Sequence, residues 1–194
     1  MRTSVIVANY NYGYYISKTI SSLMSQSMPQ NDYEVIVIDD ASNDITVRIL
    51  EPYADTVRLM LSDKHEGHLK ICNEAFIRAR GQYIVRVDAD DYVNRSLLEI
   101  EAMFLEENKG FDAVSCDYYK VDTKGNRLSR HSASGEPIAC GVMFRRESLI
   151  ENGLYDESAD IWEDVNYLKR FKNIYNIPLP LYRYVQHGES LTGV

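Results

Sequence analysis

Short apolar, β-branched runs alternate with amphipathic stretches over residues 1–91. Buried strands of parallel sheets are nearly continuously apolar, whereas surface helices repeat apolar residues every three or four positions. This pattern predicts strands at Ser4–Ala8, Val35–Ile38, Tyr83–Val87 and, with a weaker pattern, Val57–Leu61. Helices are predicted at Ile16–Met24, Ile45–Tyr53 and Leu69–Ala79. Such alternation predicts the α/β class, with a Rossmann-like, mostly parallel sheet and helices on both faces.

The pattern is less regular after Asp91. It predicts a helix at Ser96–Glu107, a strand at Ala113–Val121 and a helix at Ile161–Phe171. The polar segment Asp122–Gly135 has little periodicity, and we expect a mobile loop there. Because no linker or internal repeat divides the chain, we expect a single domain over residues 1–194.

Composition narrows the classes of function. A net charge of −8 and a pI near 5.0 argue against a nucleic-acid partner, which requires clustered basic residues. Three widely spaced cysteines favour buried, reduced thiols and therefore a cytoplasmic protein. No run approaches the roughly 20 apolar residues of a membrane span, and no signal peptide is recognised. Peripheral attachment to the inner face of the membrane stays open.

Polar side chains follow three of the predicted strands at their carboxyl ends. Asn9-Tyr10-Asn11 follows the first, Asp39-Asp40 the second, and Asp88-Ala89-Asp90-Asp91 the strand that starts at Tyr83. In open α/β sheets ligands bind in the crevice outside these ends. We therefore expect the three clusters to converge on one site.

Carboxylates gathered in one crevice repel one another unless a cation compensates their charge. Mg²⁺ and Mn²⁺ bind through one or two carboxylates together with phosphates and water, and Asp88-x-Asp90 offers that number. The alternative is a solvated acidic turn, since Asp is common at strand ends. Taken alone, the motif does not separate these two interpretations.

Several motifs in order resemble those of family 2 glycosyltransferases with the GT-A fold. They are Ser4-Val5-Ile6-Val7-Ala8-Asn9-Tyr10-Asn11, Val37-Ile38-Asp39-Asp40, Ala79-Arg80-Gly81-Gln82-Tyr83 and Asp88-Ala89-Asp90-Asp91, followed by Gly141–Arg146, Gly153–Asp156 and Glu163-Asp164. The resemblance covers nearly the whole chain. It implies a nucleotide-sugar-binding half at 1–91 and an acceptor and catalytic-base half at 92–194.

The resemblance also implies roles for single residues. The donor nucleotide-sugar would contact Ala8, Tyr10, Asn11, Asp40, Asp88, Ala89 and Asp90. Within this set Asp40 would accept the N–H of a pyrimidine ring, and Asp90, with Asp88 beside it, would ligate Mn²⁺ or Mg²⁺. The alternative for Asp40 is an Asx-turn or a helix N-cap.

Two later residues complete the implied site. Asp164 matches the general base that deprotonates the acceptor hydroxyl in an inverting transfer, although acidic residues are also common at helix N-termini. His187 resembles a carboxy-terminal histidine that ligates the metal or the diphosphate, and an ordinary surface histidine is the alternative. His65 departs from the asparagine that many relatives carry two positions before the glycine of this loop, and its role stays open.

The expected activity is transfer of one hexose-type sugar, most simply from a UDP-sugar, to a glycan or lipid-linked acceptor in cell-surface polysaccharide synthesis. Homo-oligomerisation is open. A sugar nucleotidyltransferase is a competing class, but the loop after the first strand has one glycine, Gly13, and no cation to hold a triphosphate. A non-catalytic binding domain of the same fold is the second alternative.

Overall fold

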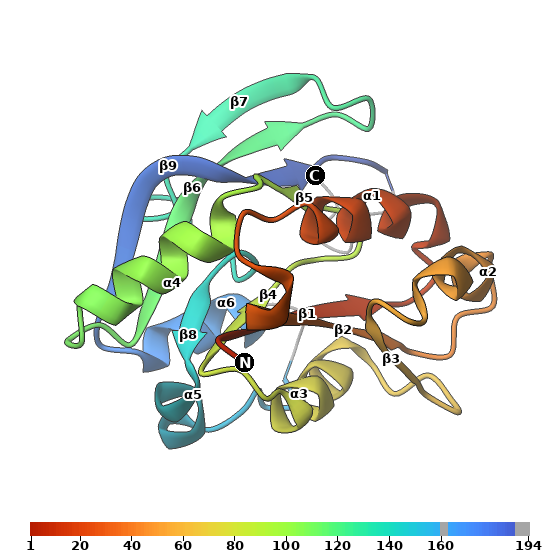
Figure 1. The fold of residues 1–194 in the computed structure, drawn as a ribbon, viewed down its shortest axis with the longest axis horizontal. Helices are drawn as coiled ribbons and strands as arrows, with labels where there is room; N and C mark the ends of the chain where they lie inside the picture. The colour runs from red at the N-terminus through yellow and green to blue at the C-terminus, as the bar shows by residue number, and fades with distance from the viewer. Residues whose placement is uncertain (160–162, 189–194) are drawn as a thin grey trace.

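One mixed sheet organises the molecule (Figure 1). The computed structural model describes residues 1–159 and 163–188, except for the side chains of 163 and 164. Its strand order is β3-β2-β1-β4-β8-β6-β9-β5, with β7 paired to β6. The strands are β1 (Thr3–Asn9), β2 (Tyr33–Asp39), β3 (Arg58–Leu61), β4 (Tyr83–Arg86), β5 (Tyr92–Val93), β6 (Ala113–Val121), β7 (Arg127–His131), β8 (Met143–Arg145) and β9 (Ile174–Val185).

The strands of the amino-terminal half are parallel. β1 pairs with β2 and β4, and β2 pairs with β3, all in parallel. β8 then runs antiparallel to both β4 and β6, and β6 pairs in parallel with the long strand β9. The carboxyl ends of β1, β2 and β4 consequently lie at one edge, which confirms the predicted α/β fold and its parallel sheet.

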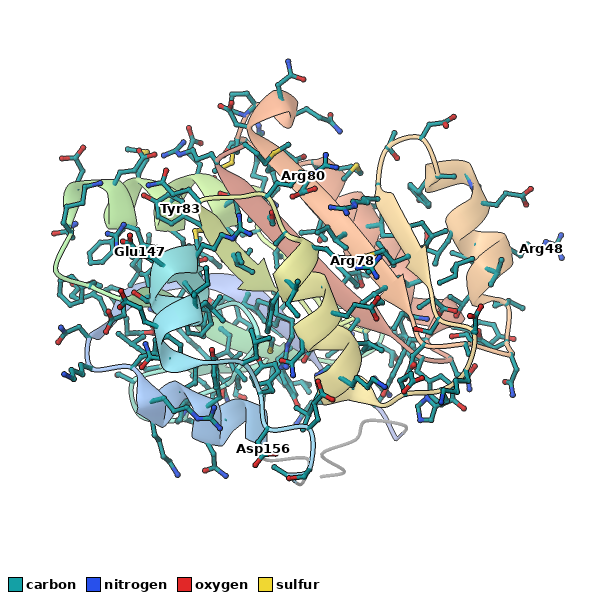
Figure 2. The ribbon with its side chains drawn as sticks, turned by 90° about the horizontal axis from the view of Figure 1, so that it is seen from below. Arg48, Arg78, Arg80, Tyr83, Glu147 and Asp156 are labelled. Atoms are coloured by element: carbon teal, nitrogen blue, oxygen red, sulfur yellow. The ribbon has the colours of Figure 1, made fainter. Side chains whose placement is uncertain are left out.

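Helices cover both faces of this sheet. They are α1 (Gly13–Met24), α2 (Thr46–Leu50), α3 (His68–Arg78), α4 (Leu97–Glu107), α5 (Arg146–Asn152) and α6 (Glu163–Tyr167). Along β1, Val5 and Val7 pack in the same cluster as α1 and α4, whereas Ile6 and Ala8 pack with α3 and α5. This alternation follows from the two-residue period of a strand. Figure 2 looks onto the face covered by α3 and α5.

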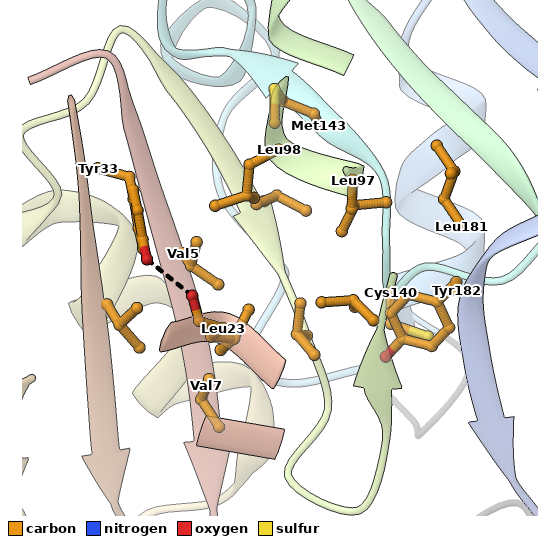
Figure 3. Packing of buried hydrophobic residues seen from close by; sticks show 14 of the residues in the cluster. Val5, Val7, Leu23, Tyr33, Leu97, Leu98, Cys140, Met143, Leu181 and Tyr182 are labelled. Atoms are coloured by element: carbon orange, nitrogen blue, oxygen red, sulfur yellow. Dashed lines mark hydrogen bonds between the residues drawn. The ribbon is translucent and has the colours of Figure 1, made fainter. Parts of the chain in front are cut away.

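The core joins the two halves of the chain. Val5 of β1 and Tyr182 of β9 belong to one buried cluster, part of which is drawn in Figure 3. In the same view the Tyr33 hydroxyl donates a hydrogen bond to the Leu23 carbonyl at 2.8 Å, which ties β2 to the end of α1. Because residues before and after Asp91 share this cluster, the division at 91 is not a break in packing.

The expected burial of the cysteines is confirmed. Cys72, Cys116 and Cys140 are buried free thiols. None of the helices that the structure describes has the length and apolar character needed to cross a bilayer.

The expected loop at Asp122–Gly135 is wrong over part of its length, because Arg127–His131 forms β7, antiparallel to β6. An edge strand that is exposed on both sides needs no alternation of apolar residues, so its sequence carries no strand signal. The 12-residue strand β9 was not anticipated either, since Pro178 and Pro180 disfavour a regular strand. The pairing of β9 with β6 shifts register near these prolines. Of the helix expected at Ile161–Phe171, the first residues lie outside the described chain.

Candidate active site

The loops after β1 and β2 are joined to each other by hydrogen bonds. The Asn9 amide donates to the Asp39 carboxylate at 2.7 Å, and the Asn11 backbone N–H donates to the Ser42 hydroxyl at 2.8 Å. Asn11 has φ 60°, a left-handed conformation that Asn tolerates better than most residues. Its side-chain carbonyl accepts the Asn43 N–H at 2.9 Å, so the Asn11 side chain joins the two loops in this conformation.

Asp40 holds the loop that precedes α3. Its fully buried carboxylate accepts the backbone N–H groups of Glu66 and Gly67 at 2.8 and 2.9 Å. Nδ1 of His65 lies 2.8 Å from the same carboxylate, and the His65 ring stacks on Tyr10 with 3.9 Å between centroids. Asp40, Tyr10 and His65 thus form one group at the sheet edge, as convergence of the first two motifs predicts. Acceptance of a pyrimidine N–H by Asp40 stays a prediction.

The third motif forms a turn directly after β4. The Asp91 backbone N–H donates to the Asp88 carbonyl at 3.1 Å, and the Ala89 carbonyl accepts the Thr19 hydroxyl at 2.7 Å. Ala89 is buried at the centre of this turn, and its side chain packs in the core. The Asp88 carboxylate lies 3.0 Å from Nε of Arg86, a residue buried at the end of β4. Asp88 is therefore charge-compensated by the protein itself.

Asp91 fixes this turn to β9. Its fully buried carboxylate accepts the Tyr182 hydroxyl and the Val185 N–H, both at 2.7 Å. The Tyr182 oxygen in turn accepts the Asp88 N–H at 3.1 Å. Tyr182 therefore contacts both ends of the acidic turn.

Asp90 faces the end of the described chain. Nε2 of His187 lies 2.8 Å from Oδ2 of Asp90, and the imidazole is only 3% exposed. Tyr15 of α1 stacks on that imidazole with 4.5 Å between centroids, and Tyr12 lies edge-on at 5.8 Å. The structure thus brings together two of the three predicted metal ligands, which are 97 residues apart in sequence.

Burial perturbs two of the aspartates in this turn. Burial, followed by the negative charge of Asp88, raises the pKa of Asp90, while the His187 hydrogen bond acts in the opposite direction. Burial also raises the pKa of Asp91 well above its usual range. An unfavourable carboxylate of this kind becomes favourable when a cation or a protonated partner is nearby.

A second grouping of possible ligands lies under the turn. One ligand atom from each of Asp88, Asp91 and Cys140 lies within 4.8 Å of the others. However, the Asp91 oxygens already accept two hydrogen bonds, and the Asp88 carboxylate is paired with Arg86. A cysteine thiol is also not among the oxygen ligands that suit Mg²⁺ and Mn²⁺. We therefore assign this grouping to the structural support of the turn, and Asp90 with His187 to the candidate metal position.

Asp164, the predicted base, belongs to α6 by its backbone, but its side chain lies outside the described residues. Tyr15 and Arg86 contact the predicted residues but were not predicted from the sequence. The i, i+3 spacing of Tyr12 and Tyr15 at the start of α1 is a signal from which Tyr15 could have been found. Tyr182 is predicted from the sequence only as a tyrosine that could line a sugar-binding cleft, and its contact with the acidic turn was not predicted because Asp91 is distant in sequence.

Comparisons with known proteins agree on one family. Residues 4–173 match the profile described as Glycosyl transferase family 2. The chain is 38% identical over 111 residues to the poly(ribitol-phosphate) beta-N-acetylglucosaminyltransferase TarS of Staphylococcus aureus, covering 56% of this chain and 19% of that protein. It is 34% identical over 220 residues to the uncharacterized glycosyltransferase EpsJ of Bacillus subtilis, covering 98% of this chain and 63% of EpsJ.

Solved structures show the same likeness. The crystal structure of S. aureus TarS residues 1–349 in complex with UDP superposes with a TM-score of 0.82 at 26% identity, covering 97% of this chain and 62% of that one. The chain therefore spans less than two thirds of these relatives.

Proposed function

We propose that this chain, which belongs to glycosyl transferase family 2, transfers one sugar from a UDP-sugar to an acceptor hydroxyl with inversion at the anomeric carbon. The observation that carries the proposal is the 2.8 Å approach of His187 to Asp90, at the sheet edge that also holds the Tyr10 and Asp40 group. A uridine donor is supported by the UDP complex of TarS. Synthesis of a cell-envelope polymer is supported by the name of TarS, a poly(ribitol-phosphate) beta-N-acetylglucosaminyltransferase. Peripheral attachment to the inner face of the membrane is part of the proposal.

The residues present fit a divalent cation. Asp90 and His187 offer a carboxylate oxygen and an imidazole nitrogen in contact, a combination that suits Mn²⁺ and is acceptable to Mg²⁺. Asp88 is paired with Arg86, so we assign Asp88 to the nucleotide side of the site. When bound, the cation would neutralise the diphosphate and improve the nucleotide as a leaving group.

The protein's own residues would orient both substrates. Tyr10 offers a ring face to the base, and we assign Asp40 to its N–H after rearrangement of His65. Asp164 would accept the proton of the attacking hydroxyl on the side of the sugar opposite the leaving nucleotide, which gives inversion. A sugar nucleotidyltransferase is not favoured, because the family match covers residues 4–173.

The metal assignment is tested by thermal unfolding in the presence of UDP-sugars. We expect a clear rise in Tm with UDP-sugar plus Mn²⁺, a smaller rise with Mg²⁺ and almost none in EDTA, because a ligand that binds only the folded state stabilises it. The dTDP- and GDP-sugars serve as donor controls. Equal stabilisation in EDTA would reject the assignment of Asp90 and His187.

Replacement of the base provides an independent test. Asp164→Asn should lower kcat at least about 100-fold, the smaller end of the usual contribution of general base catalysis. The metal-dependent rise in Tm should stay near that of the wild type. The control is Glu151→Gln, which removes an exposed carboxylate on α5 and should leave kcat unchanged. A fully active Asp164→Asn enzyme would place the base elsewhere.

A further inference from the structure

Three cations and two aromatic rings form a continuous row on the sheet beside the candidate active site. We call this row the basic ladder; its members are Lys18, Tyr92, Arg183, Tyr119 and Arg127. The Lys18 ammonium lies 3.8 Å from the centre of the Tyr92 ring. The guanidinium groups of Arg183 and Arg127 lie 5.0 and 4.5 Å from the centre of the Tyr119 ring.

Strand pairing determines this arrangement. Tyr92 of β5 and Tyr119 of β6 are both direct partners of Arg183 on β9, so the three side chains emerge on the same face of the sheet. Arg127 comes from the exposed strand β7. The hairpin between β6 and β7 turns back toward α1, since a Cβ at Gly125 would lie 3.3 Å from the Tyr92 hydroxyl and 3.4 Å from the Lys18 ammonium. In Figure 1 this hairpin stands above β5 and α1.

The charge of the ladder is not compensated within the described chain. No described carboxylate forms an ion pair with Lys18, Arg127 or Arg183. The acidic groups nearby are already engaged: Asp117 accepts from Arg130 at 2.8 Å, and Asp122 accepts the Asn126 N–H at 2.8 Å. Arg183 and Arg127 share the Tyr119 ring, and burial, followed by the positive charge of Arg127, lowers the pKa of Arg183.

Such a local surplus of positive charge is unexpected in a protein with a net charge of −8. Aromatic rings hold guanidinium groups in place without neutralising them, and guanidinium binds phosphate through paired hydrogen bonds. The ladder also leads to the site: β5 begins directly after the Asp88–Asp91 turn, and the chain continues from Arg183 through the end of β9 to His187.

We propose that the basic ladder is an acceptor subsite that binds the phosphodiester groups of an anionic chain and guides its hydroxyl groups toward the candidate active site. Naming the bound chain as acceptor rests on the proposed function. Its binding to the ladder does not, and can be measured without donor or metal.

The test uses a fluorescently labelled poly(glycerol phosphate) chain as the probe. We expect saturable binding that weakens with salt, and about tenfold weaker binding after Arg127→Gln, the loss expected for one charge-assisted contact of at least about 1.5 kcal/mol. Arg183→Gln combined with Lys18→Gln should weaken binding further. Arg48→Gln is the matched control, because it removes the same charge from an exposed position on α2 (Figure 2) and should bind as the wild type does.

Other ligands separate the alternatives. A neutral maltooligosaccharide should not bind, and a hyaluronan oligosaccharide, which carries carboxylates, should bind much more weakly. Equal binding of hyaluronan would overturn the assignment to phosphodiesters. Preferential binding to phosphatidylglycerol vesicles would instead assign the ladder to a membrane surface.

The variants also keep the two proposals distinguishable. Arg127 is exposed on an edge strand, so Arg127→Gln should fold normally, as checked by its Tm. The rise in Tm with UDP-sugar and Mn²⁺ should persist in that variant. Wild-type binding of the phosphate chain without any response to nucleotide-sugars would reject the proposed function and keep the ladder. Unchanged affinity in the Arg127, Arg183 and Lys18 variants would reject the ladder.

Discussion

The stacking of Tyr15 on His187 is a contact through which one residue positions another. The centroids of the Tyr15 ring and the His187 imidazole lie 4.5 Å apart, and Nε2 of the imidazole contacts the Asp90 carboxylate. Residues that orient a metal ligand commonly affect metal affinity about 10- to 100-fold when they are replaced. Tyr15 is therefore expected to tune the site without touching the substrate.

We predict that Tyr15→Leu raises about tenfold the Mn²⁺ concentration needed for half of the UDP-dependent rise in Tm. Tyr15→Phe keeps the ring and should behave as the wild type does. The control Tyr14→Leu changes the neighbouring side chain, which is 82% exposed, and should have no effect. A Tyr15→Leu protein with normal Mn²⁺ dependence would remove this role.

Glu101 is a buried carboxyl group on α4 that no proposed step uses. It is fully buried, and neither of its oxygens accepts a hydrogen bond from a described N–H or O–H group. Burial raises its pKa well above the usual range, although the weak S–H donor of Cys116 counteracts part of this effect. A raised carboxyl pKa means that the folded state binds the proton more tightly than the unfolded chain does.

The Glu101 carboxyl group makes the folded protein less stable as the pH rises. Below the unfolded pKa of about 4.3 the group is protonated in both states and has no effect on stability. As the pH rises from there toward the folded pKa, the group ionises in the unfolded chain while it stays protonated in the folded state. The free energy of unfolding therefore falls. We predict that Glu101→Gln is similar to the wild type near pH 4 and more stable at pH 8, by about 1 to 3 kcal/mol. The measurement is the difference in free energy of unfolding between the two proteins, and a difference that does not vary with pH would contradict it.

At the scale of elements, the turn after β4 depends on a glycine in another segment. Gly141 has φ +69°, and a Cβ there would lie 2.5 Å from the Tyr182 ring. Tyr182 contacts Asp91 and Asp88, so displacement of its ring would disturb the turn that carries Asp90. The conformation and the close approach both require glycine at this position.

Gly153 is the matched control, because it has φ +78° but a Cβ there would meet nothing within 4 Å. Gly153→Ala should cost only the strain of its backbone conformation, φ +78° and ψ 173°, about 1 to 3 kcal/mol. Gly141→Ala should cost roughly 1 to 3 kcal/mol more than Gly153→Ala, since overpacking adds to the backbone strain, and should also weaken the metal-dependent response to UDP-sugars. Denaturant unfolding and the thermal assay measure the two effects. Equal costs at both positions would show that Tyr182 moves freely.

Elements with a buried apolar pattern were predictable, and elements without one were not. The strands β1, β2 and β4 appear in the sequence because both of their faces are buried, which leaves nearly continuous apolar runs. β7 does not appear in the sequence, because it is exposed at the edge of the sheet and carries no apolar alternation. β9 does not appear either, because its two prolines remove the usual strand signal.

At the scale of the whole molecule, convergence of motifs was predictable, but individual contacts were not. The rule that parallel strands end at a common edge correctly gathered Tyr10, Asp40 and Asp90. The same rule cannot say that Asp40 holds the Glu66–Gly67 backbone, or that Asp91 is a support rather than a ligand. Those assignments depend on loop conformations and on partners from β9.

The bonds between Asp91 and β9 also constrain the order in which the protein can assemble. The two hydrogen bonds join residues that are separated by 91 and 94 positions in the sequence. The contact of Asp90 with His187 joins residues separated by 97 positions. Contacts of such separation carry a large loop-closure entropy and form after local structure. A chain still emerging from the ribosome can therefore pair β1, β2 and β4 while its acidic turn lacks support. The candidate active site is therefore complete only after β9 docks, so its assembly is a late step of folding.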